Sequence, residues 1–83
     1  MDVVKLMGRN VRAIRRERGL TQEELAHRAE MERSYVSDLE RGTRNPSVRA
    51  LARLADALGV EPAALLRRPA KEPPASSASA QTL

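Results

Sequence analysis

One short segment, "ERSYVSDLERGTRNPS" at residues 32–47, carries polar side chains suited to a dense set of hydrogen bonds. An arginine fork donates in parallel to guanine O6 and N7 or to phosphate oxygens, a hydroxyl donates and accepts, and a carboxylate accepts. The side chains concerned are those of Arg33, Ser34, Ser37 and Asp38. Only Val36 and Leu39 offer obvious apolar burial. The segment therefore predicts a short helix with a thin buried seam and a hydrogen-bonding outer face.

Five helices and no strand are expected to position this segment, because apolar residues recur at spacings of three and four. The expected ranges are about 2–18, 21–29, 33–41, 48–58 and 62–66. Thr21 and Glu24 form a capping-box pattern before the second helix, and Ser47 is a candidate cap for the fourth. The expected core positions are Val4, Met7, Val11, Ile14, Leu25, Ala26, Met31, Val36, Leu39, Val48, Leu51, Leu54, Ala55 and Leu58.

Residues 19–60, "GLTQEELAHRAEMERSYVSDLERGTRNPSVRALARLADALGV", resemble the Cro/C1-type helix-turn-helix family, also called the xenobiotic-response-element (XRE) family of bacterial and phage regulators. The matching features are Gly19, Thr21-Gln22, Leu25-Ala26, Val36, Leu39-Glu40, Gly42, Pro46 and the leucine stripe of the fourth helix. The resemblance implies an all-α, five-helix, lambda-repressor-like domain with its helix-turn-helix at helices two and three. One departure is Glu30, which stands where the family often has a turn glycine.

The resemblance also implies roles for individual residues. At the start of the third helix, base contacts are expected from Arg33, Ser34, Ser37 and Asp38. Gln22, Arg44 and Asn45 are expected at phosphates, and Arg15 and Glu40 as a structural ion pair. Tyr35 is a further candidate for a phosphate contact. It is the only aromatic residue, so in the core it would lack aromatic neighbours and leave its hydroxyl group to be satisfied. Arg9 is another candidate for a phosphate contact.

Several of these assignments have alternatives. Asp38 is repelled by phosphates, so a surface ion pair with Arg41 or Arg44 is the other interpretation. For Arg33 a base contact is the first interpretation, and a phosphate contact is the second. Most of the basic run "RNVRAIRRER" at residues 9–18 fits a solvated helix face.

The chain of 83 residues, with a net charge of +4, is long enough for one small domain. Residues 1–66 are expected to fold, whereas residues 67–83, rich in Pro, Ala and Ser, are expected to be a disordered tail. A core of this size is only marginally stable, which favours self-association. Val60, Leu65 and Leu66 are the candidate dimer contacts.

The sequence offers few residues that could support an enzyme, a metal site or a membrane protein. There is no cysteine and a single histidine, so we expect no disulfide, no metal site, no cofactor and no enzymatic activity. No apolar run suggests a membrane span or an export signal, which favours the cytoplasm. The expected function is a sequence-specific transcriptional regulator, a repressor or autoregulator, that binds a palindromic double-stranded DNA operator as a homodimer through the major groove. The alternative is a protein-interaction adaptor that keeps the fold without specific DNA binding.

Overall fold

The computed structural model describes residues 2–68, in which all regular structure is helical. Its elements are α1 (Val3–Glu17), α2 (Gln22–Arg28), α3 (Arg33–Glu40), α4 (Val48–Leu58) and the 3-10 helix η1 (Pro62–Leu66). The expected all-helical class is confirmed. The expectation of five α-helices is wrong, because η1 is a 3-10 helix whose bonds join residues i and i+3, such as Ala64 N–H to the Glu61 carbonyl (2.9 Å). The tail predicted for residues 67–83 lies outside the described residues from residue 69 onward.

The helix ends follow local signals in the sequence. Thr21 Oγ1 accepts from the Glu24 backbone N–H (3.0 Å), and the Thr21 N–H donates to Glu24 Oε1 (2.8 Å), so the capping box is complete. Ser47 caps α4 through the Ala50 N–H (3.1 Å). The α4 terminator Gly59 adopts the left-handed conformation with φ +74°.

The core fills the space enclosed by the four α-helices and η1. Its largest fully buried side chains, each less than 2% exposed, are Val11, Leu25, Val36, Leu39, Leu54 and Leu65. Val48 was expected in this core but is 83% exposed, because it is the first residue of α4 and lies beyond the buried stripe.

Gly8 allows α1 and α3 to approach closely. A Cβ at this position would overlap the carbonyl oxygen of Leu39 and press on the backbone of Glu40. The glycine therefore sets the separation of the two helices, and with it the position of the C-terminal end of α3.

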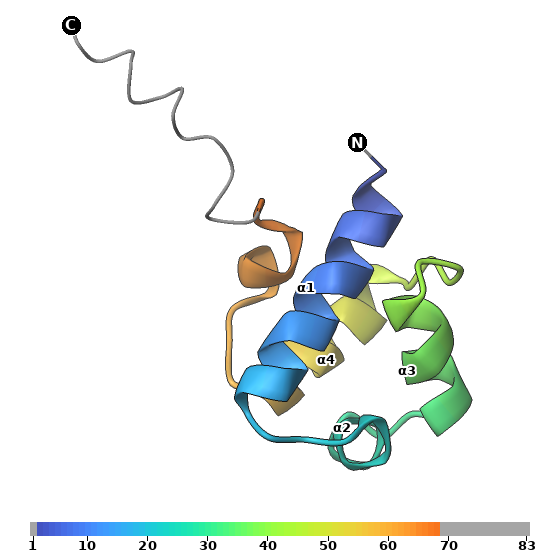
Figure 1. Ribbon diagram of the computed structural model, residues 1–83, viewed down its shortest axis with the longest axis vertical. Coiled ribbons are helices and arrows are strands. Elements are labelled where there is room, and N and C mark those ends of the chain that lie inside the picture. The colour runs from blue at the N-terminus through green and yellow to red at the C-terminus, as the bar shows by residue number, and fades with distance from the viewer. Residues whose placement is uncertain (1, 69–83) are drawn as a thin grey trace, which may run out of the picture.

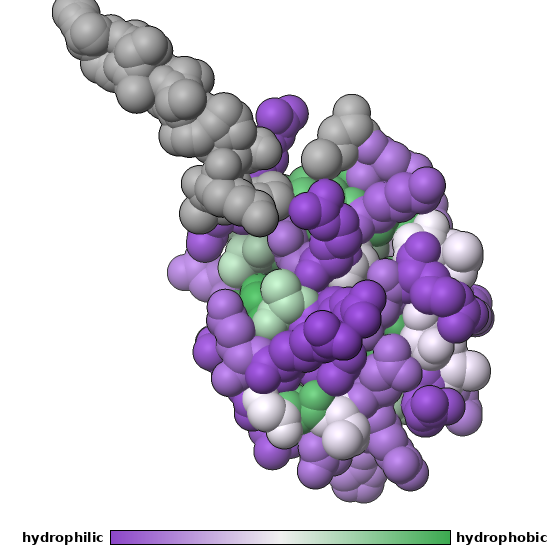
Figure 2. Space-filling view, viewed as in Figure 1, coloured by the Kyte–Doolittle hydropathy of each residue, from purple (hydrophilic) through white to green (hydrophobic). Residues whose placement is uncertain are grey.

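The elements are arranged on two sides of α1 (Figure 1). The pair α2 and α3 lies on one side and η1 on the other, with α4 behind α1 in this view. Hydrophilic side chains dominate this face, and apolar ones show only in small areas between them (Figure 2). Within residues 2–68, no helix has the length and apolar character that crossing a membrane requires.

Candidate nucleic-acid interface

The helix α3 packs against the rest of the domain through a narrow apolar seam. Val36 and Leu39 are fully buried against α1 and α2, whereas Arg33 and Ser34 at its N-terminal end are exposed. Figure 1 shows α3 at the outer edge of the molecule, with α2 crossing near its start. The expected thin seam and polar outer face are confirmed, and a short exposed helix of this kind has the dimensions to enter a major groove.

A buried ion pair holds the other end of α3. Arg15 Nε donates to Glu40 Oε2 (2.6 Å) and Arg15 Nη2 to Glu40 Oε1 (3.0 Å), while Arg15 Nη1 donates to the Leu20 carbonyl (2.7 Å). The two side chains are 11% and 3% exposed. The arginine and glutamate expected to form a structural pair thus do so.

Gln22 lies beside this pair and faces inward in part. Its Nε2 donates to Glu40 Oε1 (3.0 Å), and the residue is half-buried. One of the two amide hydrogens is therefore engaged inside the protein. A phosphate contact by Gln22 stays a prediction, and it has the second amide hydrogen available for it.

A group of polar side chains on α3 and the following loop is here called the Asp38 cluster. It consists of Tyr35, Ser37, Asp38, Arg41 and Arg44. Asp38 Oδ1 accepts from Arg41 Nη2 at 2.5 Å, and Asp38 Oδ2 lies 3.6 Å from Arg44 Nη2. The Arg44 guanidinium sits 4.7 Å from the centroid of the Tyr35 ring. Arg41 Nη1 also donates to Ser37 Oγ (3.1 Å).

The contacts within the Asp38 cluster distinguish between the roles that the sequence left open for its residues. Asp38 adopts the ion-paired arrangement that the sequence left as an alternative to a base contact. Arg41, which the sequence offered as a partner of Asp38 but not as a DNA contact, forms this pair at a spacing of three residues. Tyr35 and Arg44, both candidates for phosphate contacts, lie against one another.

The turn between α2 and α3 is held by α4. Glu30 has φ +56° and is the only described non-glycine residue with positive φ, which agrees with its place at the family's turn glycine. Arg53 Nη2 donates to the Glu30 carbonyl (2.7 Å). This contact was not expected, because an exposed arginine on a helix gives no sequence signal for the backbone atom it will reach.

A family model described as helix-turn-helix matches residues 11–65, which extend from the middle of α1 to η1. The chain belongs to the helix-turn-helix family of transcriptional regulators. Together with the geometry of α2 and α3, this confirms the resemblance seen in the sequence.

Relatives of this helix-turn-helix chain carry regulator names. The HTH-type transcriptional regulator y4dJ of Sinorhizobium fredii is 55% identical over 60 residues, which are 72% of this chain and 78% of that protein. The immunity repressor of Bacillus phage phi105 is 45% identical over 60 residues, but the match spans only 42% of its length. The crystal structure of the restriction-modification controller protein C.AhdI from Aeromonas hydrophila superposes with a TM-score of 0.73 at 42% identity, covering 75% of this chain and 94% of that one.

Two further phosphate candidates are exposed, whereas one arginine expected in solvent is not free. Arg9 on α1 and Asn45 in the loop before α4 are exposed, as phosphate contacts require. Arg18 was expected on a solvated face, but its Nε donates to the Leu58 carbonyl (2.9 Å) and so secures the end of α4.

The three residues expected at a dimer surface differ in their exposure to solvent. Leu65 is fully buried in its own subunit, so the expectation that it contacts a partner is wrong. Val60 is half-buried against the core, and Leu66 is 43% exposed. Leu66 instead borders a concave surface, here called the apolar groove, lined by Val3, Val4, Met7, Asn45, Pro46, Ser47, Val48, Leu51 and Leu66.

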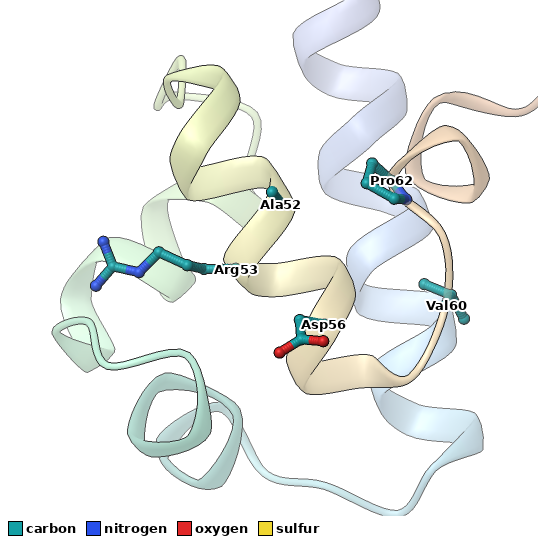
Figure 3. Close-up of a pocket in the computed structure, with 5 residues that line it drawn as sticks. All are labelled: Ala52, Arg53, Asp56, Val60 and Pro62. Atoms are coloured by element: carbon teal, nitrogen blue, oxygen red, sulfur yellow. The ribbon is translucent and has the colours of Figure 1, made fainter.

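A second hollow lies on the other side of α4 and is open to solvent. It is lined by Ala52, Arg53, Asp56, Val60 and Pro62, and Figure 3 shows Arg53 pointing away from it, toward the side of α2 and α3. Within residues 2–68, no three His, Asp or Glu side chains are grouped as a metal ion would require.

Proposed function

We propose that this transcriptional regulator binds a specific double-stranded DNA operator by inserting α3 into the major groove. The observation that carries the proposal is the orientation of α3, whose seam of Val36 and Leu39 is fully buried while Arg33 and Ser34 are exposed at its start. Arg33 would read guanine through its fork, and Ser34 and Ser37 would add hydrogen bonds to neighbouring base edges. The Asp38 carboxylate, which already pairs with two arginines, is assigned to that pairing in preference to a cytosine contact.

Phosphate contacts on either side of α3 would fix its register on the duplex. The candidates are Gln22, Tyr35, Arg44, Asn45 and Arg9. Gln22 begins α2, whereas Arg44 lies in the loop after α3 and beside Tyr35, so phosphate contacts would come from both ends of the helix-turn-helix. These contacts supply affinity and salt dependence without reading sequence.

We further propose that the protein acts as a homodimer on a palindrome, with two copies of α3 in successive major grooves. The three large apolar side chains with the greatest exposure in residues 2–68 are Val3, Val48 and Leu66, and all three border the apolar groove. A second copy packing there would remove them from water. A single domain of this size makes few DNA contacts, and pairing doubles their number.

The sign of regulation is proposed from the relatives. One is named an immunity repressor and another a controller protein of a restriction-modification system, so we propose repression, including repression of the protein's own gene. The proposed site of action is the bacterial cytoplasm, on the nucleoid. The proposal involves no enzymatic step, no cofactor and no small-molecule effector.

Selection of bound duplexes from a random pool, at two salt concentrations, tests the proposal. We expect an enriched palindrome with half-sites about one helical turn apart, and weaker binding of all duplexes at the higher salt. If no sequence is enriched and no duplex is retained at low salt, the DNA-binding proposal fails. Binding to a protein partner in its place would then support the adaptor interpretation.

A further inference from the structure

We infer that Arg41 and Arg44 form a phosphate-binding site that the carboxylate of Asp38 fills in the DNA-free protein. The inference rests on the proposed DNA-binding function. It adds Arg41 to the backbone contacts and gives Asp38 a defined role as an intramolecular competitor of DNA phosphate.

The geometry of the Asp38 cluster is that of an occupied anion site. Two guanidinium groups converge on one carboxylate, with Arg41 Nη2 at 2.5 Å from Oδ1 and Arg44 Nη2 at 3.6 Å from Oδ2. Carboxylate and phosphate both present paired oxygens that match an arginine fork. The site therefore has the charge and the donor arrangement to accept a phosphate in place of Asp38.

The backbone around Asp38 keeps both arginines in place. The Asp38 carbonyl accepts from the Thr43 backbone N–H (3.0 Å) and from Thr43 Oγ1 (3.0 Å), which folds the loop after α3 back onto the helix. The Arg44 guanidinium lies over the face of the Tyr35 ring, 4.7 Å from its centroid, and this contact helps to hold the side chain. Releasing the carboxylate would leave these supports intact, so the arginines would stay close together.

The ion pairs of Asp38 with Arg41 and Arg44 are exposed enough for a phosphate to replace the carboxylate. Arg41 and Arg44 side chains are 63% and 45% exposed, and that of Asp38 is 33% exposed. Ion pairs with this exposure are weak in water, so a phosphate held at the rim of α3 can displace the carboxylate. Each arginine that stays on Asp38 is one that does not release a counterion from DNA. Asp38 therefore lowers the affinity for duplex of any sequence.

Fluorescence anisotropy with a labelled duplex of arbitrary sequence, titrated between 50 and 200 mM salt, tests the inference. For Asp38→Asn we expect about threefold to tenfold tighter binding at the lower salt. The slope of log affinity against log salt should steepen by about 0.9 for each arginine released. The base preference in a random-pool selection should stay that of the wild type. Asp38→Ala serves as a second variant, and thermal melting shows that each variant is folded.

The matched control is Glu32→Gln, which makes the same change in net charge at the exposed residue that precedes α3. If Glu32→Gln tightens binding and steepens the salt dependence as much as Asp38→Asn, the effect is one of net charge and the inference is overturned. It is equally overturned if the gain persists in full when Arg41 and Arg44 are both changed to Gln.

Two further outcomes separate this inference from the function on which it rests. An altered base preference in Asp38→Asn would make Asp38 a base reader and overturn the inference while leaving the DNA-binding function intact. A wild-type protein that binds no duplex would overturn both.

Discussion

Arg15 and Glu40 are joined by two hydrogen bonds across the contact of α1 with α3, at 2.6 Å and 3.0 Å, and Gln22 adds a third bond to the same carboxylate. The pair is almost fully removed from water. It lies at the C-terminal end of α3, whereas the exposed Arg33 lies at the N-terminal end. The buried pair therefore fixes the direction in which α3 projects from the domain.

Replacing Arg15 with Ala should lower the free energy of unfolding by about 3–5 kcal/mol, because it leaves the Glu40 charge buried without its partner. The Leu20 carbonyl loses a donor at the same time. For a domain this small, such a loss leaves much of the protein unfolded at 37 °C. Thermal unfolding followed by circular dichroism measures the effect.

The control for this prediction is the double variant Arg15→Met with Glu40→Leu, which removes both charges and keeps apolar volume. We expect it to be considerably more stable than Arg15→Ala. Equal instability of the two variants would show that packing, and not the unpaired charge, causes the loss.

Gly8→Ala should also destabilise the domain, by about 1–3 kcal/mol, because the added methyl group overlaps the carbonyl oxygen of Leu39. In an exposed helix the same change stabilises by about 1 kcal/mol, so the sign is diagnostic. Gly19→Ala gives a comparison without steric overlap, because open space surrounds it and only its φ of +70° opposes a side chain, at a cost of about 1 kcal/mol. Urea unfolding compares them, and a Gly8→Ala protein more stable than the wild type would contradict the close approach of α1 and α3.

The sequence predicted those parts of the fold that depend on nearby residues. The capping box of Thr21 and Glu24, the Ser47 cap and the glycine that ends α4 are each decided within about one helical turn, so a pattern of residue types is sufficient. The seam of Val36 and Leu39 was predictable for the same reason, because helical periodicity fixes which side chains share a face.

Contacts between a side chain and a distant backbone atom were not predictable in this way. Asn10 Nδ2 donates to the carbonyls of Leu65 (2.9 Å) and Arg67 (2.8 Å), and Arg53 reaches Glu30 across 23 positions. Every backbone carbonyl is a possible acceptor, so residue type does not select one. The burial of Leu65 and the exposure of Val48 depend likewise on how η1 and the start of α4 lie against α1.

Glu30→Gly should raise the melting temperature by a few degrees. A residue with a side chain at φ +56° carries about 1 kcal/mol of strain, which glycine removes, although the greater freedom of glycine in the unfolded chain offsets part of the gain. The Arg53 contact is to the Glu30 carbonyl and survives the change. Differential scanning calorimetry measures the shift, with Glu32→Gly as a control at an ordinary φ of −76°, where we expect a loss.

Arg33→Ala should relax the sequence preference of the protein at a cost of about 1–3 kcal/mol at the operator, because it removes the proposed bidentate contact to guanine. Gln22→Ala should instead weaken binding to all duplexes alike. Random-pool selection with each variant distinguishes the two effects. An unchanged preferred sequence in Arg33→Ala would remove Arg33 from the base-reading role.

Val48→Glu should convert the proposed homodimer into a monomer, because it puts a charge in the apolar groove beside Leu66. The fold should tolerate the change, since Val48 is 83% exposed and a glutamate in the first turn of α4 suits the helix dipole. Light scattering across a range of protein concentrations measures the mass, and binding to a palindrome should lose its second half-site. Ala52→Glu is the matched control, because it lies exposed on the same helix outside the groove. Loss of the dimer in both variants would mean that the interface is not specific to the apolar groove. A wild-type protein that stays monomeric on operator DNA would contradict the homodimer proposal itself.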